Sequence, residues 1–302
     1  MTTDKKVIIY HDQCNDGFAA AWTARAYFGE HNCEFVPARY NRPAPEYIMR
    51  DIFILDFSYP RAELEKMKET NNAVFVLDHH KTAAMDLALL PPVIPVDAYR
   101  ETRAKQPAYS FPLMASFDMA RSGAGMAWDW FFPMFARPSL IDYVEDRDLW
   151  RFADPDTRFV HSALSAYDYD FDQWDELARR VAVPEKLVEL IGEGQTLDRK
   201  HLKLCREIIE QARRMAPIGG VLVPVCAAPY AFASDIGNMM CKGHPFAATY
   251  VEHANGITFS LRSSPEGDDA SVIAKLFGGG GHRNACGFTI PRSPDGGVTW
   301  PA

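Results

Sequence analysis

Short apolar segments follow one another through the first hundred residues, and this pattern constrains the fold more than any other feature of the sequence. Each segment is continuously apolar rather than alternating, as expected of parallel strands that are buried on both faces. Segments of helix-forming composition separate some of them, at 17–28 and 61–70. We therefore predict a doubly wound α/β sheet, with strands at 6–10, 34–38, 51–57, 73–78 and 92–97.

Acidic residues stand where three of these segments end. Asp16 follows the first segment, Asp56 follows the third, and Asp78-His79-His80 closes the fourth. The carboxyl ends of parallel strands meet at one edge of a sheet, which is where open α/β sheets bind ligands, so these side chains should lie close together. Carboxylate and imidazole groups are ligands of divalent transition metals. The sequence therefore predicts one shared metal centre, and a polar loop is the competing interpretation of the Asp-His-His triplet.

The segment before the first predicted helix adds another ligand type. His11 stands five residues before Asp16, so both side chains can face one cleft, and Gly17 allows a tight turn into the helix. The N-terminal end of a helix also favours an anionic substrate. Taken alone, Asp16 can equally be a helix cap, and Asp56 a turn residue before Pro60.

A further acidic group lies in the region that reads as helical from Ser122 onwards. Asp146 and Asp148 stand close to Trp150, and either carboxylate can complete the metal site. The sequence does not choose between them, and we favour Asp146. The competing interpretation is a charged helix end held by salt bridges.

Helix boundaries can be predicted at three further positions. Ser122 and Pro138 are typical of helix starts, and Asp172 is expected to cap another helix that runs to Arg180. Residues 98–120 contain scattered Pro and Ser without a clear period, so we predict a loop there.

The stretch 186–214 is rich in Glu, Lys, Arg and Leu and predicts long helices. We interpret it as a helical linker between a first domain, 1–185, and a smaller α/β domain, 215–302, although it can also be a surface part of the first domain. Within the second domain, Asn255-Gly256 between two apolar segments predicts a β-hairpin.

Four successive glycines, 278–281, precede His282 and Arg283 between a predicted helix and the strand 286–290. Such a run costs backbone entropy, and its best use is close approach of backbone N–H groups to a phosphate. His282, Arg283 and Arg262, which follows a hairpin strand, can add donors. A flexible linker is the competing interpretation of the glycines, and an ordinary surface residue that of Arg262.

Composition limits the classes of function. The chain has 302 residues, is 47% hydrophobic and carries a net charge of −8, which argues against binding long nucleic acid through charge alone. A small phosphorylated substrate held by a few cations and metals is compatible with this charge. The six cysteines form no Cys-x-x-Cys pair, which argues against a structural zinc site. We find no signal peptide and no apolar run of membrane-spanning length, and expect a soluble cytoplasmic protein.

In this order the motifs resemble those of the DHH phosphoesterase superfamily, whose members join an N-terminal DHH domain to a DHH-associated domain with a Gly-Gly-Gly-His motif. The Asp-His-His triplet at 78–80 matches the first motif and residues 279–282 match the second. The resemblance covers almost the whole chain, and residues 10–22 and 146–152 are similar to the branch called exopolyphosphatase-related or oligoribonuclease-like. It implies a parallel-sheet DHH domain joined by a helical linker to a smaller α/β DHH-associated domain.

The resemblance also implies a set of site residues. The metal would be Mn²⁺, as two ions, with Mg²⁺ or another divalent metal as alternatives, and Asp16 and Asp56 would be best placed to bridge them. Asp78 and His80 would be the catalytic residues that face the substrate or support the ligands. The other implied residues are the metal ligands His11, His79 and one of Asp146 and Asp148, and the substrate-binding residues Arg262, Gly279, Gly280, Gly281, His282 and Arg283.

The chain departs from the family pattern at one position. Much of the superfamily has Asp-x-Asp in the first motif, whereas this chain has Cys14-Asn15-Asp16. Cys14 can be a soft ligand that shifts the metal preference away from manganese, or it can be a bystander.

The function implied by the resemblance is metal-dependent hydrolysis of phosphoester bonds. The expected reaction is cleavage of short oligonucleotides or dinucleotides by water that two metal ions activate. A phosphoanhydride hydrolase acting on polyphosphate or pyrophosphate is one alternative, and a non-catalytic nucleotide-binding module is another. Long duplex nucleic acid and membranes are not expected partners, and a homodimer is compatible with the sequence.

Overall fold

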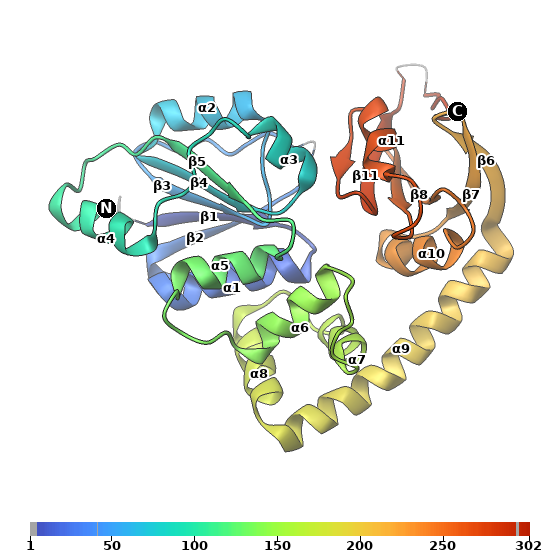
Figure 1. The fold of residues 1–302 in the computed structure, drawn as a ribbon, viewed down its shortest axis with the longest axis horizontal. Helices are drawn as coiled ribbons and strands as arrows, with labels where there is room; N and C mark the ends of the chain where they lie inside the picture. Colours follow the sequence, from blue (N-terminus) through green and yellow to red (C-terminus); the bar gives the residue numbers. More distant parts are fainter. Residues whose placement is uncertain (1–4, 41, 294–295) are drawn as a thin grey trace. The chain divides into compact units, whose positions relative to one another are not determined.

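A computed structural model of the chain describes residues 5–40, 42–293 and 296–302. The chain divides into two compact units, Met1–Asp198 and Arg199–Ala302, and the boundary falls within the long helix α9 (Pro184–Ala212) (Figure 1). The helical character predicted for 186–214 is confirmed as far as Ala212. The strand β6 (Arg213–Ile218), which the sequence analysis missed, begins directly after it.

In the described residues of the first unit, five parallel strands form one sheet in the order β2-β1-β3-β4-β5. Every residue of β3 and of β4 is buried, which explains why their sequences are continuously apolar rather than alternating. The prediction of a parallel sheet is thereby confirmed. The strands are β1 (Lys6–His11), β2 (Cys33–Ala38), β3 (Asp51–Leu55), β4 (Ala73–Asp78) and β5 (Leu113–Phe117).

Helices cover both faces of this sheet, with α1 and α5 on one face and α2 and α3 on the other (Figure 1). Phe53 packs toward Phe131 of α5, whereas its strand neighbour Ile52 packs toward Leu64 of α2. Successive strand residues thus enter two separate apolar cores, as the period of a strand requires. The helices are α1 (Asn15–Phe28), α2 (Arg61–Thr70), α3 (Lys81–Asp86) and α5 (Gly123–Phe131), and the short 3₁₀ helix η1 (Glu30–Asn32) follows α1.

The edge of the sheet differs from the sequence prediction. The segment 92–97 is not a strand, because Pro91, Pro92 and Pro95 cannot donate to a strand ladder, and helix α4 (Val96–Lys105) begins directly after them. The edge strand is instead β5, within the segment predicted to be a loop. Its short apolar sequence, LMASF, carries too little pattern to have been recognised.

A helical group completes the first unit. Ser122 caps α5 by accepting from Gly125 N, and Pro138 directly precedes α6 (Ser139–Asp148), so both predicted helix starts are confirmed. The cap of α8 (Phe171–Ala182) is Asp170 rather than Asp172, because Asp170 accepts the hydrogen bond from Gln173 N. The remaining helix is α7 (Thr157–Leu164). No helix in the described ranges is both long and apolar enough to cross a membrane.

The described part of the second unit contains a mixed sheet in the order β10-β11-β9-β8-β7-β6, in which β7 and β8 are the parallel pair. The predicted hairpin is confirmed, since β8 and β9 pair antiparallel with His253 opposite Gly256. The elements after β6 are β7 (Val221–Ala227), η2 (Tyr230–Phe232), α10 (Ala233–Met240), β8 (Ala247–His253), β9 (Gly256–Arg262), α11 (Ala270–Leu276), β10 (Gly280–Gly281) and β11 (Ala285–Pro291).

Candidate metal centre

The acidic and imidazole residues predicted from the strand ends of the first unit lie close together. His79, which directly follows β4, is 2% exposed, and its Nε2 atom faces three carboxylates. It lies 3.0 Å from Asp56 Oδ1, 3.6 Å from Asp148 Oδ2 and 3.7 Å from Asp16 Oδ2. One imidazole nitrogen therefore meets oxygen atoms from three separate parts of the sequence.

His11 and Cys14 approach the same cluster through Asp56. His11 Nδ1 lies 3.5 Å from Asp56 Oδ2, and His11, Cys14 and Asp56 each offer a ligand atom within 4.8 Å of the others. Asp56 also belongs to a group with Asp78 and the two histidines that follow it. Asp56 thus connects two sets of ligand atoms, which is the arrangement required of a bridging carboxylate.

The backbone at the cluster is strained and tightly packed. Asp56 adopts the left-handed conformation with φ of +55°, which costs an ordinary residue about 1–3 kcal/mol. A Cβ atom on Gly123 would lie 2.3 Å from Asp56 Cβ, and one on Gly17 would lie 2.3 Å from His11 O. Both glycines are therefore required for the close approach of helix starts to the strand ends.

Asp16 lies in the first turn of α1, but its carboxylate accepts hydrogen bonds from backbone amides at the start of α5. Its Oδ2 accepts from Gly123 N at 2.6 Å and its Oδ1 from Ala124 N at 2.9 Å, at the start of α5. The sequence analysis missed these two amides, although the predicted cap at Ser122 marked the place where they lie. They fix the carboxylate so that Oδ2 also faces His79.

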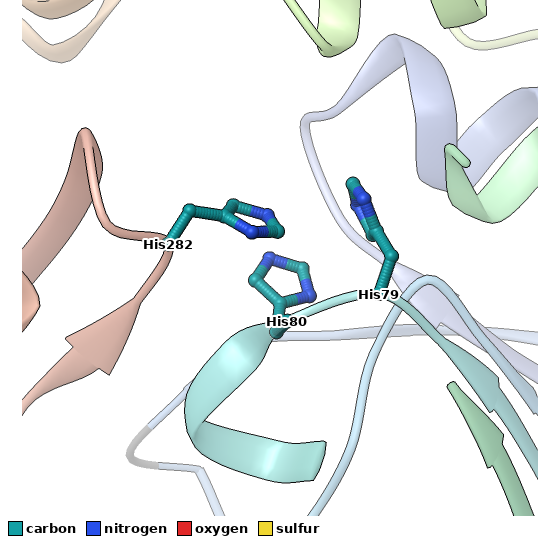
Figure 2. A group of neighbouring side chains, drawn as sticks. All are labelled: His79, His80 and His282. Atoms are coloured by element: carbon teal, nitrogen blue, oxygen red, sulfur yellow. The ribbon is translucent and has the colours of Figure 1, made fainter. Parts of the chain in front are cut away.

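Asp78 and His80 form a fixed pair beside the cluster. Asp78 Oδ1 accepts from His79 N at 2.7 Å and lies 2.7 Å from His80 Nδ1. Figure 2 shows the rings of His79 and His80 next to each other at the end of β4, with centroids 4.9 Å apart. Asp78 therefore orients His80 rather than facing solvent, since its side chain is fully buried.

The structure brings Asp148 into the cluster and leaves Asp146 outside it. Asp146 accepts from Ala153 N, Asp154 N and Thr157 Oγ1, so its oxygens hold the loop after α6. The preference for Asp146 in the sequence analysis therefore lacks structural support, because one helical turn cannot point both acids in the same direction. The competing interpretation, a charged helix end held by salt bridges, applies to the neighbouring Glu145, which pairs with Arg121 and Arg137.

The cluster carries an excess of buried negative charge. Burial and the charges of Asp56 and Asp148 raise the pKa of Asp16 well above its usual range. Burial also raises the pKa of the Cys14 thiol, and Asp56, Asp148 and Asp16 add to this rise. Burial opposes charging of His79, but the contact with Asp56 and the nearby acids outweigh it and raise the pKa of that ring to about 11. A cation is the group that this environment favours.

Buried polar atoms at the cluster also lack partners. Among the residues that the structure describes, the oxygens of Asp56 have no hydrogen-bond partner beyond the rings of His79 and His11, and Asp78 Oδ2 has none. Leaving such atoms unpaired in the interior is costly, so a ligand that they could share is expected. Oxygen and nitrogen atoms in this number fit a divalent cation such as Mn²⁺ or Mg²⁺.

In the second unit, the conformation of the glycine run has a local cause. A Cβ atom on Gly279 would lie 2.1 Å from Gly287 O, and one on Gly281, where φ is +129°, would lie 2.7 Å from Ala285 O. Gly279 N donates to Ala274 O, and Gly280 pairs with Gly287 in the sheet. These glycines therefore allow the chain to pack against β11, and Gly279 N is not available to a phosphate.

The three polar residues predicted to bind substrate in this unit have defined positions. His282 lies on the loop between β10 and β11, where its backbone N–H donates to Ala285 O at 2.8 Å (Figure 2). Arg262, at the end of β9, donates from Nη2 to Ser234 Oγ at 2.8 Å. Arg283 donates to Gly267 O at 2.9 Å and so ties its loop to a neighbouring loop.

Comparison with known proteins addresses the fold. No protein-family model matches the chain. An uncharacterized protein, R106, of Acanthamoeba polyphaga mimivirus is 26% identical over 307 residues, which cover 94% of this chain and 67% of that protein.

Two solved structures are similar to the chain across most of its length. A DHH domain described as a member of the s1p family of ribosomal proteins matches with a TM-score of 0.55 and 13% identity, covering 94% of this chain and 82% of its own. RecJ from Thermus thermophilus, solved in complex with Mn²⁺, matches with a TM-score of 0.49 and 14% identity, covering 95% of this chain and 49% of its own. The first of these two matches shows that the chain has the α/β fold of a DHH-domain protein. The resemblance stated from the motifs is confirmed at the level of the fold.

Proposed function

We propose that the chain is a metal-dependent phosphodiesterase that hydrolyses short oligonucleotides or dinucleotides. The observation that carries the proposal is the position of His79 Nε2 within 3.7 Å of oxygens from Asp16, Asp56 and Asp148. Buried acids with few partners, a strained aspartate and two neighbouring histidines are the donor set that a phosphoryl-transfer metal centre needs.

In the first unit, some residues would bind the cations and others would orient the side chain that faces the substrate. Asp16, Asp56, His79 and Asp148 would hold one cation, and His11 with Asp56 would hold a second. When bound, such cations would polarise the phosphoryl group and lower the pKa of attacking water. Asp78 would keep the His80 ring directed toward the substrate, because its carboxylate contacts His80 Nδ1.

Cys14 is best explained as a conditional ligand. Its sulfur lies within 4.8 Å of ligand atoms of His11 and Asp56, yet burial and three nearby acids keep the pKa of the thiol well above its usual range. A soft metal would bind and deprotonate it, whereas Mn²⁺ would leave it protonated. Metal preference should therefore change in a Cys14→Asp variant, toward harder ions.

Charge favours a short substrate over a long one. The net charge of −8 would repel an extended polyanion, while a di- or trinucleotide needs only a few local donors. In the second unit, the guanidinium of Arg262 and the ring of His282 are proposed to bind phosphate groups.

The proposal can be tested with purified protein, Mn²⁺ and three separate substrates: a labelled dinucleotide, 3′-phosphoadenosine 5′-phosphate and polyphosphate. We expect mononucleotide release from the dinucleotide, loss of activity with EDTA, and a loss of at least about 10³-fold in Asp56→Asn. Orthophosphate release from polyphosphate alone would replace the proposal with a phosphoanhydride hydrolase. Tight dinucleotide binding without turnover would indicate a binding module.

A further inference from the structure

Two carboxylates from different helices hold the start of α5. Gly123 N and Ala124 N donate to the carboxylate of Asp16, which comes from α1. The preceding amide, Ser122 N, donates to Glu145 Oε2 of α6 at 3.0 Å. Asp16 belongs to the metal centre, whereas Glu145 lies outside the groups of possible ligand atoms found in the described residues.

The carboxylate of Glu145 is closely fitted to this position. The residue is 7% exposed, and its oxygens also accept from Arg121 Nε and from Arg137 Nη1, each at 3.1 Å. A Cβ atom on Gly125, in the first turn of α5, would lie 2.0 Å from Glu145 Oε2. A glycine is therefore needed at 125 to leave room for the carboxylate against the helix start.

Ion pairing alone does not explain why this acid is buried. Arg121 Nη1 lies 2.7 Å from Asp129 Oδ2, and Arg137 Nε lies 2.8 Å from Asp129 Oδ1. Asp129 is half-exposed and pairs with both arginines without the desolvation cost that a buried carboxylate carries. What distinguishes Glu145 from Asp129 is the hydrogen bond from the buried Ser122 N.

This hydrogen bond connects the supports of two acids of the metal centre. Asp148 follows Glu145 by three residues on α6, which is nearly one helical turn. Asp16, whose carboxylate is fixed by the amides of α5, shares a group with Asp148 and His79 in which the ligand atoms lie within 4.8 Å of one another. Glu145 therefore attaches the helix that carries Asp148 to the helix start that fixes Asp16.

We infer that Glu145 is a positioning residue of the metal centre, which sets the separation of the Asp16 and Asp148 carboxylates by accepting from Ser122 N. It contacts neither cation nor substrate. The inference rests on the metal centre of the proposed function. Metal ligands have to be held within about 0.5 Å of their productive geometry, so a loosened contact between α5 and α6 would weaken cation binding.

The test is calorimetric titration of the full chain with Mn²⁺, at a temperature where circular dichroism shows each variant to be folded. Glu145→Met removes the acceptor of Ser122 N and should weaken Mn²⁺ binding about 10–100-fold. Asp129→Asn is the matched control, because Asp129 shares both arginines with Glu145. It should leave the affinity within about twofold of the unsubstituted protein.

Two further variants separate positioning from stability. Glu145→Gln keeps an oxygen acceptor but loses the charge, so urea unfolding in EDTA should show a less stable protein whose Mn²⁺ affinity stays within about threefold of the unsubstituted one. Glu145→Asp keeps the charge and withdraws the carboxylate by one methylene group. It should weaken Mn²⁺ binding, and it replaces Glu145→Met in the comparison if that variant does not fold.

Unchanged Mn²⁺ affinity in Glu145→Met and Glu145→Asp, or an equal loss in Asp129→Asn, would overturn the inference. Absence of Mn²⁺ binding in the unsubstituted protein would overturn it together with the metal centre. Mn²⁺ binding without hydrolysis of the dinucleotide, 3′-phosphoadenosine 5′-phosphate or polyphosphate would contradict the proposed function alone, because the affinities of the Glu145 and Asp129 variants still decide the role of Glu145.

Discussion

The two units of the chain use polar residues in opposite ways. In the first unit, three acids crowd around His79, and one of them, Asp56, has a strained backbone and no partner for its oxygens beyond two imidazoles among the described residues. In the second unit, Arg262 and Arg283 donate to Ser234 and Gly267. The first arrangement is unstable by itself and implies a ligand, whereas the second is stable as it stands.

This difference shows which of the two sequence motifs, the Asp-His-His triplet or the glycine run, indicates a binding function. The Asp-His-His triplet lacks a purely structural explanation, because its His79 lies against a cluster of acids in which burial and the neighbouring carboxylates raise the pKa of Asp16 well above its usual range. The glycine run has one, because a Cβ on Gly279 would collide with Gly287 O. Both motifs stand out in the sequence. The triplet is explained by the binding of a ligand, whereas the glycine run is explained by backbone packing.

The sharpest test of this comparison uses two acids of the first unit that are two residues apart. Burial and nearby Asp56, opposed by His79, raise the pKa of Asp148, whereas hydrogen bonds from Thr157 and backbone amides overcome burial and lower that of Asp146. At pH 7 the charge on Asp148 therefore costs stability and the charge on Asp146 adds to it. Asp148→Asn should stabilise the metal-free protein, lose the stabilisation by Mn²⁺, and reduce activity by about 10²–10³-fold.

Asp146→Asn is the matched variant and should behave in the opposite way. It should destabilise the protein by about 1–2 kcal/mol, because it weakens hydrogen bonds to Ala153 and Thr157, while retaining the Mn²⁺ effect. Urea unfolding in EDTA and in Mn²⁺ measures both variants. If Asp146→Asn were the variant that lost the metal effect, the assignment of Asp148 to the cluster would be wrong.

The sequence predicted the residues of the cluster better than the hydrogen bonds and helix rotation that hold them in place. His11, Asp56 and His79 could be placed together because each ends or follows a buried parallel strand, and strand ends meet by geometry alone. The choice between Asp146 and Asp148 depends on the helix rotation, which a charged stretch does not reveal. The amides of Gly123 and Ala124 that hold Asp16 come from more than a hundred residues away, and no local pattern marks such contacts.

The fold was predictable to the same extent. Central strands carry a strong signal, because burial on both faces demands continuous apolar sequence. The edge strand β5 and strand β6 carry little, since β5 is short and exposed residues interrupt β6. Prolines at 91, 92 and 95 were the available evidence against a strand at 92–97.

A second prediction concerns a satisfied ion pair of the second unit. His201 Nε2 lies 3.0 Å from Asp235 Oδ2, and hydrogen bonds with Asp235 and Cys205 raise the pKa of His201 to about 9. Because the folded pKa is above the unfolded one, the stabilisation is complete below about pH 6.5 and is lost as the pH rises through 9. His201→Gln should therefore cost on the order of 2–3 kcal/mol at pH 6 and little at pH 10.

Urea unfolding across this pH range measures the effect. The matched variant is His253→Gln, because His253 contacts the neutral hydroxyl of Thr258 at 2.9 Å rather than a carboxylate. Its unfolding free energy should change little at either pH. A pH-independent loss in His201→Gln would mean that the ring stabilises the unit by stacking on Phe232, with ring centroids 5.0 Å apart, and not by charge.

The smallest expected effect tests whether the ordered arginine of the second unit also serves binding. Ser234→Ala removes the acceptor of Arg262 Nη2, so the guanidinium would be oriented less firmly. We expect KM for a dinucleotide to rise about three- to fivefold with kcat nearly unchanged, since uniform binding is lost. Ser110→Ala is the control, because Ser110 likewise accepts from a cation, Lys68 Nζ, at 2.8 Å, but in the first unit. An unchanged KM in Ser234→Ala would mean that Arg262, like Arg283, has a structural role only. The polar residues of the second unit would then stabilise its fold, whereas those of the first unit bind a ligand.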